Sequence, residues 1–192
     1  MKRTVHMVLF SAVSSFLFLS SGCSRKPSVL VPIEEKKLYW SAALSGDMST
    51  LDGCLNRGFE VNSSDKQGWT ALMLASYYGY DNVVTNLLAR GANPKMARHD
   101  GWTCLHYAAQ SGYTSICQQL IDKGAKINVQ SRDAETPLLL AATFGQTDVV
   151  KLLVSQGAHL NTKDHAGDTA LAMSRKEKFP KIERILMEAG AR

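Results

Sequence analysis

Blocks of apolar and polar residues recur along most of this chain. In one block, Thr70 begins a short apolar run that ends at Gly79, which is typical of a helix of about two turns with a hydroxyl cap. A second helix is predicted from Asp81 to Gly91, because its apolar residues fall on one face. The residues of that face are Val83, Val84, Leu87 and Leu88. Each block is therefore predicted to hold two short antiparallel helices.

The blocks repeat with a period of 33 residues, so that Thr70 recurs as Thr103, Thr136 and Thr169. One pair of short helices cannot bury its apolar face alone, and neighbouring pairs are expected to stack and bury it between them. The fold class is predicted to be all-α. A content of 45% apolar and 20% charged residues is that of an ordinary globular protein, not of a disordered one.

Two stretches of one block carry a resemblance to a known family. The run DGWTCLHYAA from Asp100 to Ala109 and the run LIDKGAKIN from Leu120 to Asn128 closely resemble the ankyrin repeat. The resemblance covers about Leu38 to Arg192, as one incomplete opening unit and four further units. It implies an ankyrin-repeat solenoid of stacked helix-turn-helix units with short turn fingertips.

Five positions depart from the pattern of that family. Ala134 stands where the turn glycine is expected, and Lys178 replaces the glycine between the last two helices. A proline at the start of a helix is replaced by Ala71, Cys104 and Ala170. The turn geometry near Ala134 and the order near Lys178 are therefore expected to deviate.

The first and last units are expected to cap the stack with polar outer faces. The first helix is predicted over residues 34–44, with Leu38, Ala42 and Ala43 on its buried side. The last helix is predicted to begin at Pro180, because proline is tolerated in the first turn of a helix.

The segment before the repeats has the form of an export signal. Lys2 and Arg3 make its start positive, and residues 8–19 are an apolar run too short to span a bilayer. The sequence Ser-Ser-Gly-Cys that ends at Cys23 resembles the lipobox of bacterial lipoproteins, although Ser20 stands where that family prefers leucine. Lipidation of Cys23 is predicted, and the alternative is export with cleavage nearby and no lipid.

These features divide the chain into three predicted parts: a signal peptide (1–22), a lipidated tether (23–33) and the repeat domain (34–192). The location predicted from them is the periplasm, with a lipid anchor in a bacterial membrane. By resemblance to enterobacterial sorting, Ser24 after the cysteine favours the outer membrane.

The reactive side chains within the repeats are assigned structural roles. Cys54 aligns with a leucine column and is expected to be buried, and a Cys104–Cys117 disulfide is disfavoured because the ends of two different helices would have to meet. His106 stands where the ankyrin family has a histidine that braces the turn. Neither His99 with Asp100 nor Asp164 with His165 has a nucleophile partner, and no cofactor, metal set or catalytic residue is predicted.

In ankyrin proteins, the turn tips and the exposed side of each first helix form a concave groove that binds other proteins. Carried over by resemblance, the partner-binding positions are Lys66, Gln67, Trp69, Tyr77, Tyr78, His99, Asp100, Trp102, Gln110, Ser111, Arg132, Asp133, Glu135, Thr143 and Phe144, with His165, Ala166, Asp168, Lys176 and Glu177 in the last unit. Trp69 and Trp102 lie one repeat apart and are expected to form a continuous aromatic patch, or else to pack on the neighbouring turn. Truncating either is expected to cost about 2 kcal/mol of partner binding with little effect on the fold.

The predicted function is protein–protein interaction. Some bacterial ankyrin lipoproteins resemble immunity proteins, which implies inhibition of a toxic effector active in the periplasm, such as a co-encoded lipase-type enzyme or phospholipase. The alternatives are a scaffold that stabilises a periplasmic enzyme such as a catalase, and an enzyme with an unrecognised site. The formal net charge of +5 comes with no basic stripe or zinc spacing, so nucleic acid is not an expected partner, and the chain alone is expected to be monomeric.

Overall fold

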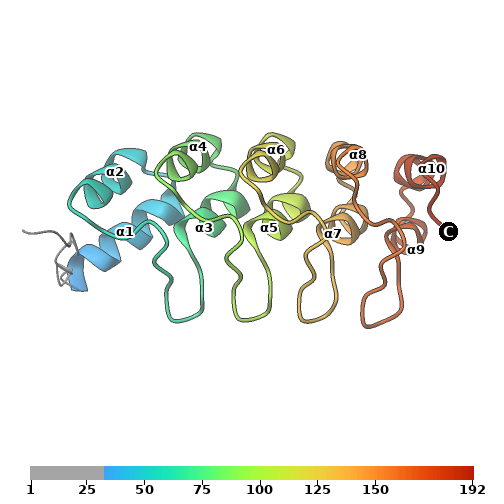
Figure 1. The fold of residues 1–192 in the computed structure, drawn as a ribbon, viewed down its shortest axis with the longest axis horizontal. Helices are drawn as coiled ribbons and strands as arrows, with labels where there is room; N and C mark the ends of the chain where they lie inside the picture. The colour runs from blue at the N-terminus through green and yellow to red at the C-terminus, as the bar shows by residue number, and fades with distance from the viewer. Residues whose placement is uncertain (1–32) are drawn as a thin grey trace, which may run out of the picture. The chain divides into compact units, whose positions relative to one another are not determined.

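The computed structural model describes residues 33–192, which contain ten α-helices arranged in two rows (Figure 1). The inner row, nearest the long loops, holds α1 (Ile33–Ser45), α3 (Ala71–Tyr78), α5 (Cys104–Ser111), α7 (Pro137–Thr143) and α9 (Ala170–Lys176). The outer row holds α2 (Met48–Asn56), α4 (Asp81–Ala89), α6 (Thr114–Asp122), α8 (Thr147–Ser155) and α10 (Pro180–Glu188). Four hairpin-shaped loops, here called fingers 1 to 4, precede α3, α5, α7 and α9 and project away from both rows (Figure 1). The predicted all-α solenoid is confirmed.

Threonine hydroxyls begin most of the inner helices, as predicted. Thr70, Thr136 and Thr169 each accept a hydrogen bond of 3.2 Å from the backbone N–H three residues later. Such a cap satisfies one of the donors that the first turn of a helix leaves free. The last helix, α10, begins at Pro180, so the proline lies in the first turn of that helix. The recurrence of threonine therefore fixes where α3, α5, α7 and α9 start.

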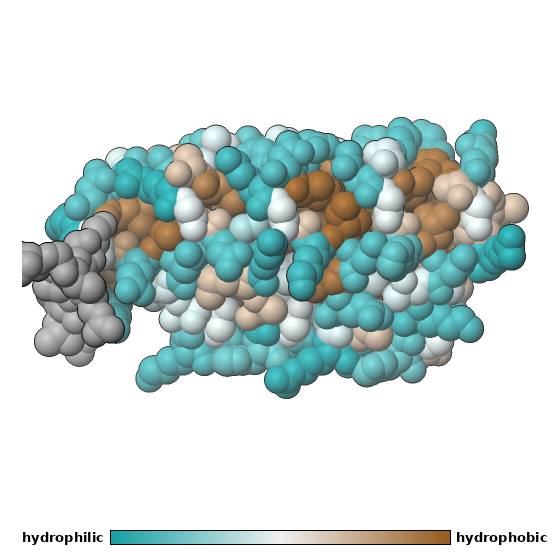
Figure 2. All heavy atoms as spheres, viewed as in Figure 1, coloured by the Kyte–Doolittle hydropathy of each residue, from teal (hydrophilic) through white to brown (hydrophobic). Residues whose placement is uncertain are grey.

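The core lies between the two rows, where apolar residues meet at one position in every unit. Leu87, Leu120, Leu153 and Leu186 are fully buried, and Cys54 takes the same place in the opening unit at 2% exposure. A single helix pair cannot bury this column, so neighbouring pairs stack and bury it between them. Figure 2 shows the result as an apolar band between the rows, with hydrophilic side chains along the outer helices and the finger ends.

A second column links neighbouring units at the junction between inner and outer helices. The hydroxyl of Tyr80 donates to the Leu44 carbonyl at 3.2 Å, and that of Tyr113 donates to the Tyr78 carbonyl at 3.3 Å. One unit later, Gln146 Nε2 donates to the Gln110 carbonyl at 2.9 Å. These bonds tie the ends of α1, α3 and α5 to the unit that follows each of them.

The opening helix corrects one prediction. Leu38 is 44% exposed, whereas Tyr39 is fully buried with Ala42 and Ala43. Residues at i, i+3 and i+4 share a helix face, so the buried face of α1 begins at Tyr39 and turns Leu38 outward. The Tyr39 ring stacks on Phe59 with 4.0 Å between centroids, which explains why the larger side chain is the buried one.

Two expected deviations are absent. Ala134 and Lys178 replace turn glycines, yet both take the left-handed conformation, with φ of 61° and 62°. The glycines at the same position as Ala134 in the other fingers have φ of 86° or 87°. The repeat geometry therefore overrides the local preference of these two side chains, at a cost of about 1–2 kcal/mol for each.

The predicted signal peptide, Cys23 and the tether up to residue 32 lie outside the described residues. Within residues 33–192, every helix is too short or too polar to cross a membrane.

Candidate functional site

The four fingers are built by hydrogen bonds within each loop and between loops. In finger 1, Asp65 Oδ1 accepts from the backbone N–H groups of Gln67 and Trp69 at 2.8 and 2.9 Å. Between fingers, the backbone N–H of Arg132 donates to the Asp100 carbonyl at 2.8 Å, and that of His165 donates to the Asp133 carbonyl at 3.0 Å. These bonds fix the tips of fingers 2, 3 and 4 relative to one another, and between fingers 1 and 2 His99 Nε2 lies 3.4 Å from the Lys66 carbonyl oxygen.

A groove of about 840 Å³ lies on the finger side of the inner helices, at the N-terminal end of the stack. Its walls come from α1, finger 1, α3, finger 2 and α5. The lining residues are Lys37, Trp40, Ser41, Leu44, Asp65, Gln67, Trp69, Leu74, Tyr77, Tyr78, Arg98, Tyr107 and Gln110. Aromatic rings and aliphatic chains dominate this lining, which is the usual character of a protein or ligand site.

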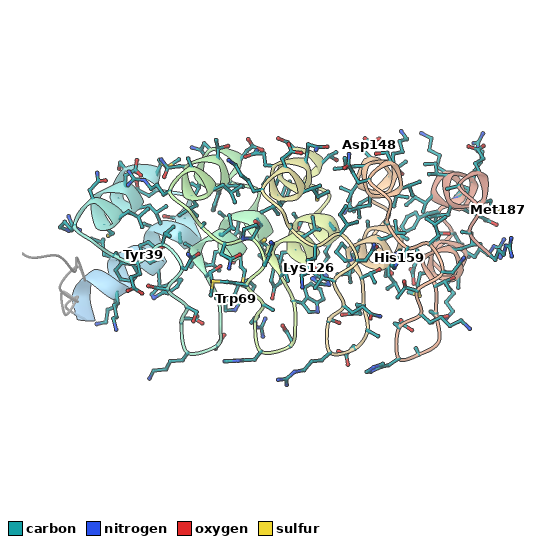
Figure 3. All side chains as sticks on the ribbon, viewed as in Figure 1. Tyr39, Trp69, Lys126, Asp148, His159 and Met187 are labelled. Carbon is teal, nitrogen blue, oxygen red and sulfur yellow. The ribbon has the colours of Figure 1, made fainter. Side chains whose placement is uncertain are left out.

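Trp69 forms the centre of the groove wall, between the first two fingers in Figure 3. Its ring stacks on Tyr107 with 4.6 Å between centroids, and the Arg98 guanidinium lies 5.0 Å from the ring centroid. Arg98 Nη1 donates to the Tyr107 hydroxyl at 3.2 Å, and that bond raises the pKa of Arg98. Two side chains of the next unit thus hold the half-buried indole in place in the groove wall.

Tyr77 and Tyr78 continue the aromatic lining, and the Tyr77 ring lies 6.3 Å from the Trp69 ring between centroids. They are 40% and 44% exposed, and their rings meet edge to face at 5.0 Å. Exposed aromatic rings beside an apolar groove are common anchors in protein interfaces, because they bury a large area with little loss of side-chain entropy.

Trp102 lies outside the groove lining, but Tyr107 links it to Trp69, because the Tyr107 ring lies 4.6 Å from the Trp69 ring and 5.0 Å from the Trp102 ring between centroids. Its Nε1 donates to Glu135 Oε2 at 3.1 Å, and its ring packs over His106 with 5.7 Å between centroids. The difference arises from the next unit: Trp69 is followed one repeat later by Trp102, but Trp102 is followed by Glu135, which attracts the indole N–H. The contacts of both indoles also change the expectation for their truncation, which should cost stability as well as binding.

His106 is fully buried and braces finger 2, as predicted. Its Nδ1 accepts from the backbone N–H of Thr103 at 3.1 Å, so its Nε2 carries the proton and donates to the Glu135 carbonyl at 3.2 Å. Burial lowers the pKa of His106 from 6.5 to about 4. A neutral imidazole with both nitrogens engaged is a structural group, not a free base.

The thiols of the repeats are also structural. Cys54, Cys104 and Cys117 are buried and free, and the Cys104 thiol donates to the Pro94 carbonyl at 3.2 Å. Burial raises the pKa of Cys104 and of Cys117 to about 12. Residues 33–192 contain no cluster of three or more His, Cys, Asp or Glu side chains that could hold a metal ion.

Thirteen of the predicted partner-binding residues fall into four groups. Gln67, Trp69, Tyr77, Tyr78 and Gln110 line the groove. Lys66, His99, Arg132 and Asp133 are exposed at the finger tips, and Asp100, Trp102 and Glu135 are half-buried within the fingers. Phe144 is 49% exposed but lies at the end of α7, away from the groove. Their role in binding stays a prediction.

Sequence reasoning missed several groove residues, above all Trp40, Leu44, Arg98 and Tyr107. The position of Tyr107 holds leucine in two other units and looked like part of the core. Arg98 left a signal in the repeat, because its position holds aspartate or serine in the other three fingers. A cation in place of a short side chain that accepts hydrogen bonds indicates that finger 2 has a different role from the other fingers.

Comparisons with known proteins agree with this architecture. A family model for ankyrin repeats (3 copies) matches residues 38–131 and 124–192. The chain is 44% identical over 64 residues to the ankyrin repeat, SAM and basic leucine zipper domain-containing protein 1 of Echinops telfairi, a match of 33% of this chain and 13% of that protein. The Homo sapiens protein of the same name is 42% identical over 71 residues, which is 36% of this chain and 15% of that protein. The similarity thus covers about one seventh of the length of these relatives.

Proposed function

The chain belongs to the ankyrin-repeat family. From this membership and from the form of its N-terminal segment, we propose that it is an exported, lipid-anchored protein whose groove binds one protein partner. Ankyrin-repeat proteins are generally binding modules and not enzymes, and the described residues offer no catalytic constellation. The observation that carries the proposal is the groove of about 840 Å³ with Tyr77 and Tyr78 exposed on its wall. The stacking of the repeats does not require either ring, so their exposure is best explained by a partner that covers them.

The partner is an enzyme that acts outside the cytoplasm, such as a phospholipase delivered by a neighbouring cell, and binding inhibits it. This part rests on the sequence: the positive start, the apolar run of residues 8–19 and Cys23 together have the form of a lipoprotein leader. A lipid anchor confines the inhibitor to the membrane surface and raises its effective concentration where such an enzyme works.

Photo-cross-linking in living cells tests the binding part. A photoreactive amino acid at Tyr78 should trap one protein, whereas the same group at exposed Arg184 on α10 should not. The trapped protein is identified by mass spectrometry and purified. Tyr78→Ala should weaken its binding about 30-fold, since an interface anchor contributes about 2 kcal/mol. Phe144→Ala, at the same repeat position but outside the groove, is the control and should change binding less than about threefold. Equal effects of the two substitutions argue against the groove as the binding site.

The same purified partner decides between inhibition and stabilisation. An inhibitor abolishes the activity of the enzyme at equal concentrations of the two proteins. A stabilising scaffold leaves that activity intact and lengthens its half-life on heating. Labelled fatty acid should enter the wild-type chain and not Cys23→Ser, and absence of label in both would remove the lipid anchor from the proposal.

A further inference from the structure

The row of fingers begins one unit later than the row of inner helices in the described part of the chain. The inner helix α1 has 13 residues, whereas the other inner helices have seven or eight. In steps of 33 residues, positions 33–37 align with positions 66–70, which form the second half of finger 1. In α1 these positions form a turn of helix, so finger 1 has a neighbouring finger on one side only within residues 33–192 (Figure 1). We call its other side the open end of the row.

The backbone of finger 1 presents a hydrogen-bond donor at the open end. At two of the three junctions of the row, a backbone N–H of one finger donates to a backbone carbonyl of the finger before it. Arg132 donates to Asp100 at 2.8 Å, and His165 donates to Asp133 at 3.0 Å. Lys66 holds the same repeat position in finger 1, and its backbone N–H has no acceptor within residues 33–192. A further finger beside finger 1 would supply that acceptor.

Side chains also connect the first two fingers to the unit that follows each of them. Trp69 of finger 1 stacks on Tyr107 with 4.6 Å between centroids, and the Arg98 guanidinium lies 5.0 Å from its ring centroid. Trp102 holds the same position in finger 2, and its Nε1 donates to Glu135 Oε2 at 3.1 Å. A finger at the open end would by the same pattern place one side chain on finger 1 and α3.

The residues that would receive this side chain already line the groove. One repeat before Arg98 and Tyr107, the equivalent positions hold Asp65 and Leu74, and both are half-buried in the groove lining. Asp65 Oδ1 accepts from two backbone N–H groups of its own finger, whereas Asp65 Oδ2 has no donor within residues 33–192. Leu74 therefore offers an apolar contact, and the second oxygen of Asp65 offers a hydrogen-bond acceptor beside it.

We propose that the partner binds the open end as an additional finger. It presents a hairpin loop whose backbone carbonyl accepts from the Lys66 N–H and whose Trp or Tyr side chain packs on Leu74 and donates to Asp65. Tyr77 and Tyr78, at the end of α3, contact the rest of the partner. This inference rests on the proposed function and adds the shape and chemistry of the segment that is bound.

The shape follows from the backbone of the row. The carbonyls in the interior of a helix are bonded within that helix, so a helix has none to offer to the Lys66 N–H. An extended loop leaves carbonyls free along its edge. Fingers 1 and 2 are themselves loops of this kind, each closed by one antiparallel bridge. A hairpin is therefore the element that continues the row.

Peptide selection tests the inference without knowledge of the natural partner. The full chain, extracted in mild detergent, is used to select from two displayed libraries, one of loops closed into hairpins by a disulfide and one of linear peptides of the same length. The binders should come mainly from the hairpin library and share a Trp or Tyr at one place in the loop. Binders mainly from the linear library, or hairpins without such a residue, would overturn the inference.

One selected hairpin is then synthesised twice, with its Trp or Tyr and with phenylalanine in that place. Asp65→Asn keeps one acceptor oxygen for finger 1 and replaces the other with an amide that cannot accept. This variant should bind the Trp or Tyr hairpin about tenfold more weakly and the phenylalanine hairpin less than about twofold more weakly. Asp164→Asn, at the same position in finger 4, is the control and should leave both affinities unchanged. Equal weakening of the two hairpins by Asp65→Asn would overturn the inference.

Hydrogen exchange at the Lys66 backbone N–H tests the geometry of the bound loop. Saturation with the hairpin should slow this exchange at least about tenfold, because the N–H then has an acceptor. An unchanged rate would show that the bound segment does not extend the row. Sedimentation of the chain alone tests the other occupant: a dimer that the hairpin dissociates would mean that a second copy fills the open end, and the inference would be wrong.

Tyr78→Ala separates this inference from the proposed function. If the selected peptides depend on Tyr78 and not on Asp65, the groove binds protein and only the additional finger is wrong. If they depend on Asp65 and not on Tyr78, the open end binds protein and the role proposed for the exposed tyrosines is wrong. If they depend on neither residue, both proposals fail.

Discussion

Protonation of His106 should destabilise the repeat stack in mild acid. The ring is fully buried, and its two nitrogens bond to the Thr103 N–H and the Glu135 carbonyl. A second proton on the ring would turn Nδ1 into a donor that faces another donor. Burial of the ring adds to the cost of this second proton. The two hydrogen bonds of His106 therefore hold finger 2 and finger 3 in place only while the ring is neutral.

The size of the effect follows from the two pKa values. In the unfolded chain, His106 has the ordinary pKa of 6.5, and in the folded chain burial lowers it to about 4. The unfolded chain binds the proton more tightly, so this contribution to stability is complete above pH 6.5 and is lost as the pH falls towards 4. The full loss is about 3 kcal/mol, and about 2 kcal/mol of it falls between pH 7.5 and pH 5.

Urea unfolding of wild type and His106→Gln at about pH 7.5 and pH 5 measures this difference. Glutamine can accept from Thr103 and donate to Glu135 but does not ionise in this range. The drop in unfolding free energy from pH 7.5 to pH 5 should be about 2 kcal/mol larger in wild type. His165→Gln, at an exposed finger tip, is the control and should change stability by less than about 0.5 kcal/mol at either pH.

Equal pH dependence of wild type and His106→Gln would refute the reasoning. Coincident transitions by circular dichroism and tryptophan fluorescence are needed for this comparison, because repeat proteins can unfold in stages. Where the transitions separate, the ring resonances of His106 in an NMR titration give an independent measurement. They should keep their neutral positions down to about pH 5.

Three further predictions concern single side chains. Gly79→Ala should lower the free energy of unfolding in urea by about 3 kcal/mol, because φ is 79° and the new Cβ would lie 2.4 Å from the Tyr113 ring. The control Gly91→Ala has a φ of 86° but open space around the new Cβ, and it should cost about 1 kcal/mol. Equal losses in the two variants would contradict this prediction. Ala134→Gly should raise stability by about 0.5 kcal/mol, since it relieves a φ of 61°, and a loss would show that the alanine is unstrained. The Cys104 thiol should react with a disulfide reagent at least about 1,000-fold more slowly in the native chain than in urea, and fast native labelling would refute its burial.

The fold could be predicted from the sequence because each structural position recurs. Thr70 and its repeats cap helices, Leu87 and its repeats fill the core, and the glycine positions set the turns. Every unit tests the same interpretation of a position, so one unusual residue such as Ala134 does not obscure it. The one error in helix orientation, at Leu38, fell in the opening helix, which lacks a preceding unit to define its buried face.

The groove could be predicted only in part, because it depends on which side chains meet across units. Alignment placed Trp69 and Trp102 in equivalent positions, but their contacts are not equivalent. Trp69 meets Arg98 and Tyr107 of the next unit, whereas the next unit offers Glu135 to Trp102. The period of the sequence gives the position of each side chain and says nothing of the partner that the neighbouring unit supplies.

This dependence on neighbours also explains why the groove can be specific in a regular scaffold. Each repeat contacts only adjacent repeats, so substitutions in fingers 1 and 2 can reshape the groove without disturbing α8 or α10. The threonine, leucine and glycine positions that build the stack are separate from the finger positions that differ between units. Arg98, which stands where the other fingers have aspartate or serine, is such a finger position. The charge at this position can therefore match the partner, while residues elsewhere in the repeat maintain the fold.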